Sequence, residues 1–186
     1  MKYLIAGLGN IGEEYANTRH NIGFVVADAL VNERKGSFTN DRYADMAKLR
    51  FKGKSLVVIK PTTFMNRSGK AIRYWLNKEN IPLSNLLVLV DDIDLPFGML
   101  RMRKKGGPGS HNGLEDIVAL LETTEFSRLR IGIGDDFARG HQVDYVLGKW
   151  SRKEEELMIP RVEKALEIIK SFAAIGPDRT MNVYNE

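Results

Sequence analysis

The sequence contains no cysteine among its 186 residues, so it can form neither disulfide bonds nor a thiolate nucleophile. Long apolar runs are also absent, since no segment approaches the roughly 20 residues that a membrane-spanning helix needs. The N-terminus lacks a signal-peptide pattern, because a glycine turn ends its apolar run after a few residues. The lack of cysteine fits a reducing compartment. We therefore expect a cytoplasmic protein without a membrane partner.

The composition that remains is ordinary for a globular protein, with 43% hydrophobic and 28% charged residues. A chain of 186 residues has room for one domain with a substantial core, and we expect residues 1–186 to form that single domain. The 28 basic and 24 acidic residues give a formal net charge of +4. This mild excess permits a polyanionic partner but does not require one.

Strand-like and helix-like segments alternate along the chain. Apolar runs predict strands over residues 2–7, 46–51, 55–61, 86–92, 99–103 and 128–134. Helical periodicity predicts helices over residues 22–34, 68–80, 114–122 and about 152–174. Residues 52–54 suit a hairpin turn, and Pro160 should kink the last helix or divide it in two. The pattern predicts an α/β fold, a mixed β-sheet flanked by helices.

Two motifs resemble nucleotide-binding turns but lack essential parts. Gly7, Gly9 and Gly12 match G-x-G-x-x-G after a strand, yet polar residues follow and the first predicted helix begins only near Ile22. The stretch FMNRSGKA ends like a P-loop, but phenylalanine and alanine replace its first glycine and its hydroxyl residue. The sequence therefore argues against a dinucleotide cofactor.

Three aspartates follow the most apolar predicted strand: Asp91, Asp92 and Asp94. Carboxylates at the end of a strand can hold Mg²⁺, and this edge of an open α/β sheet is where sites form. A solvated turn before Pro96 explains the same residues, and no other cluster of carboxylates or histidines supports a metal. Spacing alone leaves both interpretations open.

Polar residues also gather where predicted strands meet loops or helices. The set is Asn10, His20, Asn66, Asp91 and Asn112. Each residue alone suits a structural role, such as a turn residue or a helix cap. Together they place one histidine, one aspartate and three amides at the edge where α/β sites form. With no G-x-S-x-G motif in the sequence, this set favours water activated by a base over a covalent nucleophile.

Basic residues predict phosphate contacts at two predicted strands. Residues 101–105 (RMRKK) contain four cations and no acid, and Arg128 alternates with Arg130 further along. Positions two apart share a face of a strand, so Arg101 with Arg103, and Arg128 with Arg130, each present paired charge. A solvated sheet edge protected by cations explains the same pattern.

Five blocks of the sequence, in order, resemble bacterial peptidyl-tRNA hydrolases. They are LIAGLGNIGEEYANTRHNIGF, KPTTFMNRSGKA, DDIDLPFG, HNGL and RLRIGIG, and the resemblance runs from residue 3 to about residue 149. It implies an enzyme of translation that recycles prematurely released peptidyl-tRNA by hydrolysing the ester between the peptide and the terminal ribose. It further implies no metal or cofactor, and a monomer built as one α/β domain around a mixed, twisted sheet.

The resemblance also implies roles for individual residues. His20 would take a proton from the attacking water, and Asp91 would orient its imidazole. Asn10 would help to recognise the blocked aminoacyl end, while Asn66 and Asn112 would hold the substrate and could stabilise the oxyanion. Contacts with tRNA are implied for two aromatic and three basic residues, namely Tyr15, Phe64, Arg101, Arg103 and Arg130.

The sequence departs from the family pattern at three places. Ile11 replaces the usual proline, residues 104–111 are poorer in glycine than is usual, and Glu115 stands where a basic residue is common. A non-catalytic RNA-binding relative of the same fold is the alternative function. The intact His20, Asp91 and Asn10 favour the enzyme.

Overall fold

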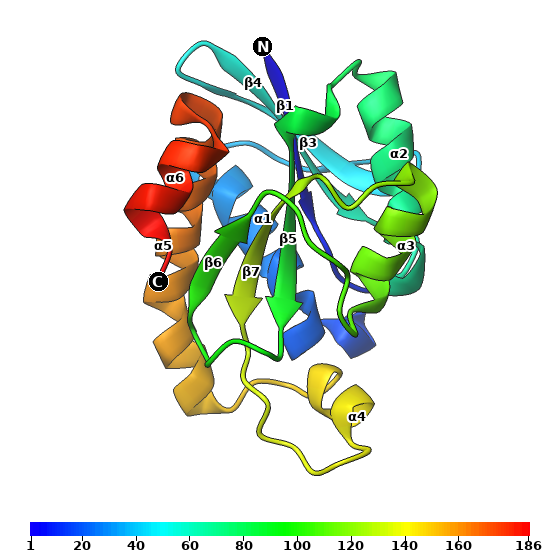
Figure 1. Ribbon diagram of the computed structural model, residues 1–186, viewed down its shortest axis with the longest axis vertical. Coiled ribbons are helices and arrows are strands. Elements are labelled where there is room, and N and C mark those ends of the chain that lie inside the picture. The colour runs from blue at the N-terminus through cyan, green and yellow to red at the C-terminus, as the bar shows by residue number, and fades with distance from the viewer.

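The apolar runs of the sequence form one seven-stranded sheet in the computed structural model, which describes residues 1–186 (Figure 1). Its strands are β1 (Lys2–Gly7), β2 (Thr39–Asp41), β3 (Ala44–Phe51), β4 (Lys54–Pro61), β5 (Leu86–Asp92), β6 (Leu100–Arg103) and β7 (Ser127–Gly132). Their order is β2-β3-β4-β1-β5-β7-β6. β4, β1, β5 and β7 run parallel at the centre, and antiparallel strands close both edges. The expected α/β fold with a mixed sheet is confirmed.

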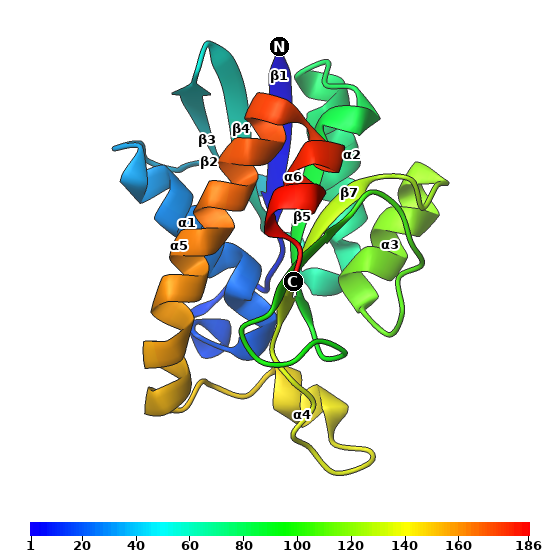
Figure 2. The ribbon, with the colours of Figure 1, turned by 60° about the vertical axis from the view of Figure 1, so that its left-hand side comes forward.

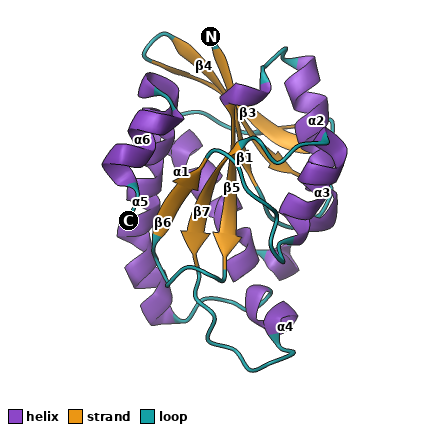
Figure 3. Ribbon diagram, viewed as in Figure 1, coloured by secondary structure: helices purple, strands orange, loops and turns teal.

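Helices cover both faces of this sheet (Figures 2 and 3). They are α1 (Ile22–Glu33), α2 (Ser68–Lys78), α3 (Asn112–Leu121), α4 (Gln142–Val146), α5 (Arg152–Ile175) and α6 (Pro177–Tyr184). Because side chains alternate along a strand, Tyr3 and Ile5 of β1 join the core beneath α1 and α5. Leu4 and Ala6 join the core beneath α2 and α3. No helix is both long and apolar enough to cross a membrane.

The elements follow the sequence prediction closely where the apolar pattern is strong. The hairpin between β3 and β4 is confirmed, and both Lys52 (φ 48°) and Gly53 (φ 77°) take the positive φ of a two-residue turn. The prediction misses three short elements, β2, α4 and α6. α5 is one continuous helix through Pro160 rather than two. Residues beyond the proline, such as Ile169 and Phe172, are buried in the core, and this packing favours the unbroken helix.

The glycines of the opening motif serve close packing. A Cβ on Gly7 would lie 2.3 Å from the carbonyl oxygen of Gly23, and a Cβ on Gly9 would lie 2.8 Å from the ring of Phe24. The loop after β1 therefore presses directly against the start of α1. Only a 3-10 turn of three residues (Glu13–Tyr15) follows the glycines, and the first α-helix begins at Ile22. The glycines therefore do not form a dinucleotide-binding turn, and the same packing brings His20 to the carboxyl edge of the sheet.

Candidate active site

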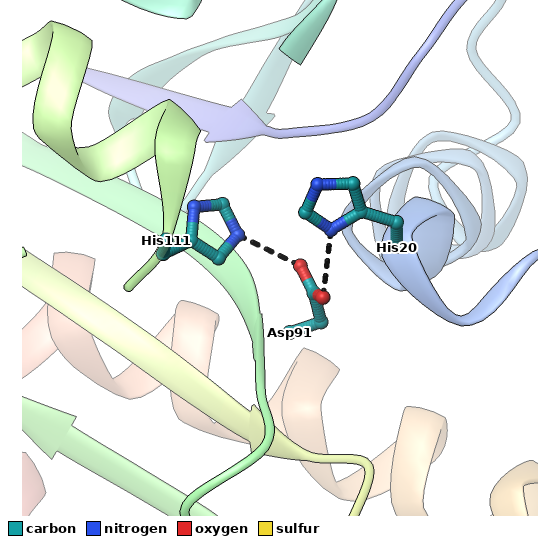
Figure 4. Close-up of side chains that lie close together, drawn as sticks. All are labelled: His20, Asp91 and His111. Atoms are coloured by element: carbon teal, nitrogen blue, oxygen red, sulfur yellow. Dashed lines mark hydrogen bonds and ion pairs between the residues drawn. The ribbon is translucent and has the colours of Figure 1, made fainter. Parts of the chain in front are cut away.

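Asp91, at the end of β5, lies between two histidines (Figure 4). Its side chain is only 2% exposed. Oδ2 of Asp91 is 2.8 Å from Nδ1 of His20, and Oδ1 is 2.8 Å from Nε2 of His111. His20 comes from the short 3-10 turn before α1, and His111 from the residue before α3. The carboxylate therefore joins two segments that are distant in the sequence.

The hydrogen bonds of His111 fix its tautomer. Its Nδ1 accepts from the backbone N–H groups of Gly113 (3.1 Å) and Leu114 (3.2 Å), and so caps the N-terminus of α3. Since a backbone N–H can only donate, Nδ1 carries no proton, and Nε2–H donates to Asp91. His111 thus ties the position of the aspartate to the start of a helix.

His20 binds Asp91 through its other ring nitrogen, Nδ1, whereas His111 binds it through Nε2. Its Nδ1–H donates to Asp91, which leaves Nε2 without a protein partner at a surface pocket that His20 helps to line. An imidazole held in this way can accept a proton at Nε2, and the carboxylate behind it stabilises the resulting cation.

The pKa of Asp91 results from two opposing effects. Burial by itself raises the pKa of this carboxyl, because it penalises the charged form. The attraction of His20 and His111, together with their hydrogen bonds, outweighs burial and holds the pKa below its ordinary value. Asp91 is therefore ionised at neutral pH and suited to orient a base.

The three aspartates of DDIDLP do not converge. Asp91 binds the two histidines, whereas the carboxylate of Asp92 pairs with Arg130 and also accepts from the backbone N–H of Asp94. His20, Asp91 and His111 do bring three potential ligand atoms within 4.8 Å of one another. However, His111 needs its Nε2 proton for the hydrogen bond it makes, so these residues form a hydrogen-bonded chain. The geometry gives no support to a magnesium site built from the aspartates.

Asn10 presents a donor to the pocket. Its Oδ1 accepts from the backbone N–H of Met65 (2.7 Å), and this contact identifies which atom is the oxygen. Its backbone is held on both sides by Asn21, through two hydrogen bonds of 2.8 Å. The Nδ2 group of Asn10 is therefore the part left for a ligand.

The pocket beside His20 gathers most of the predicted substrate residues. Asn10, Tyr15, Phe64, Asn66 and Asn112 all line it. The rings of Tyr15 and Phe64 meet edge to face at 6.4 Å, and Phe64 is 48% exposed despite its apolar ring. Segments after β1, after β4 and at the start of α3 thus meet at one site, as the strand-end pattern predicts.

A second pocket also includes His20 and Asp91. Its lining holds four cations and three aspartates, and we call it the basic pocket for this small excess of cations. Arg103 and Arg130 line it, with the glycine-rich loop before α3. Partial burial, followed by the charges of Arg101 and Arg130, lowers the pKa of Arg103, which indicates a positive environment. Arg101 does not line this pocket, because its guanidinium donates to the main-chain oxygen of Glu186.

Arg128 lines the same pocket as Arg130 but is buried, so the predicted pair of outward charges is wrong for Arg128. The residue is 2% exposed, and its guanidinium donates to the carbonyl oxygens of Gly106 (2.7 Å), Thr124 (2.8 Å) and Phe126 (3.1 Å). Burial, and secondarily Arg130, lowers its pKa to about 10. Arg128 anchors the loop that lines the basic pocket.

Sequence reasoning missed His111 and the segment around α4. Val143 and Val146 of α4 line the two pockets. Arg19 holds this segment, since its Nη1 donates to the carbonyl oxygen of Tyr145 (3.1 Å) and its guanidinium lies 4.3 Å from the Tyr145 ring centroid. The sequence pointed to His111 only through its neighbour Asn112. α4 has five residues, too few for a helical periodicity that the sequence could reveal.

Comparison with known proteins decides the family. The family sequence model for peptidyl-tRNA hydrolase matches residues 4–186. The chain belongs to the peptidyl-tRNA hydrolase family. It is 58% identical to a peptidyl-tRNA hydrolase of Parabacteroides distasonis over 185 residues, covering 100% of this chain and 99% of the relative. It is 55% identical to that of Phocaeicola vulgatus over 186 residues, covering both chains fully.

Solved structures of peptidyl-tRNA hydrolases share the fold. The crystal structure of the Acinetobacter baumannii enzyme superposes with a TM-score of 0.92 at 34% identity, covering 98% of this chain and 94% of the other. Against that family, the departures of this member leave the site intact. Ile11 is exposed beside Asn10, and Glu115 lies on the exposed first turn of α3, where a negative charge is favourable.

Proposed function

We propose that this peptidyl-tRNA hydrolase cleaves the ester between a peptide and the terminal ribose of tRNA with water that His20 activates. Membership of the family supports the reaction. The observation that carries the mechanism is the imidazole of His20, bound through Nδ1 to the buried Asp91 and open at Nε2 towards the substrate pocket.

Each group in this mechanism has a defined task. Nε2 of His20 accepts a proton from water while the water oxygen bonds to the carbonyl carbon of the ester. Asp91 holds the Nδ1–H and stabilises the imidazolium. The proton then passes to the ribose oxygen as the bond between that oxygen and the carbonyl carbon breaks. The products are a free carboxylic acid and tRNA with its terminal hydroxyl restored.

Negative charge develops on the carbonyl oxygen during the attack, and amide donors suit this oxyanion. Asn66 and Asn112 are exposed where they line the pocket with His20. We assign their Nδ2 groups to the carbonyl oxygen and to holding the substrate, because donors already in place stabilise the charge as it forms.

The donor of Asn10 explains how charged tRNA is spared. A peptide or N-acetyl group brings a carbonyl oxygen, which accepts from Nδ2 of Asn10. The free ammonium of aminoacyl-tRNA brings only N–H donors, and Oδ1 of Asn10 is held by Met65, which leaves Nδ2 as the group offered to the ligand. Two facing donors repel each other, so the site favours the blocked substrate.

Residues on the two sides of the site suit two parts of the tRNA, its unpaired 3′ end and its backbone phosphates. We assign Tyr15 and Phe64 to the aminoacylated 3′ end, where ring faces can stack on unpaired bases. Arg103 and Arg130 lie in the basic pocket, where they suit backbone phosphates. Arg130 already pairs with Asp92, which leaves Arg103 as the one of these two cations without an acidic partner. Arg101 would contribute only if it left Glu186. We further propose that residues 1–186 act as one domain, as a monomer and in the cytoplasm.

The test compares N-acetyl-aminoacyl-tRNA with unblocked aminoacyl-tRNA, each with and without EDTA. We expect hydrolysis of the blocked substrate alone, undiminished by EDTA. The Asn10→Ala variant should narrow the preference for the blocked substrate by about tenfold, the value of one hydrogen bond to the substrate. Binding of tRNA without hydrolysis would instead support the RNA-binding alternative, and loss of activity in EDTA would restore a metal at Asp91.

A further inference from the structure

Two cations and two tyrosines form a surface cluster between α2 and the turn that joins β2 to β3. We call Arg42, Tyr43, Lys70 and Tyr74 the basic aromatic cluster. The two tyrosine rings meet edge to face at 5.5 Å. Cζ of Arg42 lies 5.2 and 5.5 Å from the centroids of Tyr43 and Tyr74, and Nζ of Lys70 lies 4.8 Å from that of Tyr43. The rings therefore hold both cations in defined positions.

Neither cation of the cluster is neutralised by a carboxylate. Arg42 and Lys70 are exposed and form no ion pair, whereas Lys48 and Lys60 of the neighbouring strands are paired with acids. Asp41 adjoins Arg42 but accepts from its backbone N–H rather than from the guanidinium. A hydrogen bond from Arg42 is the main effect that lowers the pKa of Tyr43, and the charges of Arg42 and Lys70 add to it against the opposing effect of burial. The cluster thus offers two free cations to an anion.

The cluster adjoins the substrate pocket. The backbone N–H of Thr62 donates to the carbonyl oxygen of Tyr43 (2.8 Å), and the next residue, Thr63, lines the pocket. Oγ1 of Thr63 donates to the carbonyl oxygen of Arg67 (2.8 Å), another lining residue. Lys70 stands about one helical turn beyond Arg67. Short links through Thr62 and Arg67 thus connect the lining of the pocket with both sides of the cluster.

The sheet order separates this cluster from the basic pocket. Asp91 ends β5, and the arginines of the basic pocket lie on β7 and β6, to one side of it. The cluster lies beyond β1 and β4, at the start of β3, on the other side. The peptide (acyl) part and the tRNA part of the substrate extend from the ester carbonyl in different directions. With the tRNA phosphates on the basic pocket and the 3′ end at Tyr15 and Phe64, we assign the acyl half to the side of the cluster.

We propose that the basic aromatic cluster binds acidic side chains in the peptide half of peptidyl-tRNA, and so makes acidic peptides better substrates. This proposal rests on the proposed function. From β5 to β3 there are three strand spacings, which amount to about 14 Å. An extended chain covers that span in about four residues. The acidic side chains that matter are therefore the fourth and fifth from the ester.

The experiment uses three substrates with the same tRNA and the same esterified residue. Two are N-acetylated pentapeptidyl-tRNAs that differ only in carrying Glu-Glu or Gln-Gln at the fourth and fifth positions from the ester. The third, N-acetyl-aminoacyl-tRNA, is too short to reach the cluster. The enzymes are the wild type, the Arg42→Gln/Lys70→Gln double variant and the control Lys78→Gln. Lys78 is an exposed lysine further along α2 that forms no ion pair.

At low salt, we expect kcat/KM of the wild type for the Glu-Glu substrate to exceed that for Gln-Gln by about three- to tenfold, the effect of two exposed ion pairs. The control should keep this ratio, and the double variant should bring it to about one. A ratio near one in the wild type, or an unchanged ratio in the double variant, would overturn the proposal. So would an equal loss on all three substrates, since the cluster would then bind tRNA. Failure of the wild type on the short substrate would instead count against the proposed function.

Discussion

Substitution of His111 tests the site most clearly, because its two ring nitrogens make separate interactions. Nδ1 caps α3, and Nε2–H holds Oδ1 of Asp91 at 2.8 Å. His111→Ala removes both interactions. Loss of a cap costs about 1 kcal/mol of stability. Loss of a hydrogen bond to a buried carboxylate costs about 1.5–3 kcal/mol, and frees Asp91 to turn away from His20.

His111→Asn separates the two effects. Asparagine is a good N-cap residue, but its shorter side chain cannot cap α3 and also reach Asp91. We expect this variant to regain about 1 kcal/mol in urea unfolding relative to His111→Ala. Its kcat should nevertheless remain about 10- to 100-fold below that of the wild type, because about 1.4 kcal/mol of lost positioning corresponds to a factor of ten. KM should change little in either variant.

The assay is single-turnover hydrolysis of N-acetyl-aminoacyl-tRNA, paired with urea unfolding of the same preparations. If His111→Asn recovers the rate together with the stability, His111 only caps the helix. If His111→Ala hydrolyses at the wild-type rate, the bond to Asp91 does not contribute to the reaction. Either result would refute the positioning of Asp91 by His111.

Three further predictions follow from the same contacts. The lowered pKa of Asp91 means that its ionised form stabilises the native state above the unfolded pKa of about 3.9, a contribution lost as pH falls through the lower folded value. The unfolding free energy of the wild type, relative to Asp91→Asn, should thus be steady from about pH 5 to 7 and decrease only below about pH 4 in urea titrations. Arg128→Met should lower the unfolding free energy by about 2–3 kcal/mol, since it leaves buried carbonyls unpaired, and should speed hydrogen exchange in residues 104–111. Arg103→Gln/Arg130→Gln should weaken tRNA binding at low salt and reduce the slope of log K against log salt by about one for each lost phosphate contact, and an unchanged slope would remove these residues from the interface.

The sequence predicts the centre of this fold well because its strands are continuous apolar runs. The run from Leu86 to Val90 is fully buried in β5, and such a run has few alternatives in a protein of this size. The peripheral elements depend on tertiary contacts instead. β2 is three exposed polar residues that pair only with β3, and α4 is one short helix held by Arg19. Neither has a periodicity that the sequence could reveal.

The site shows the same division. Strand-end polarity and the family resemblance brought together His20, Asp91 and the three asparagines, which the structure places around two adjoining pockets. The role of His111 depends on which nitrogen faces α3, and spacing does not reveal that. The alternation of Arg128 with Arg130 predicted two outward charges. However, Cζ of Arg128 lies 4.1 Å from the Phe126 ring centroid, and its guanidinium donates to main-chain carbonyl oxygens.

The central claim is that His20 activates the attacking water, and kcat of His20→Ala on N-acetyl-aminoacyl-tRNA tests it most directly. A positioned general base contributes about 10²- to 10⁴-fold. We expect kcat to fall by about 10³-fold, with KM within about twofold of the wild type and an unchanged far-UV circular dichroism spectrum. A folded variant that keeps more than about a tenth of the wild-type kcat would contradict the claim.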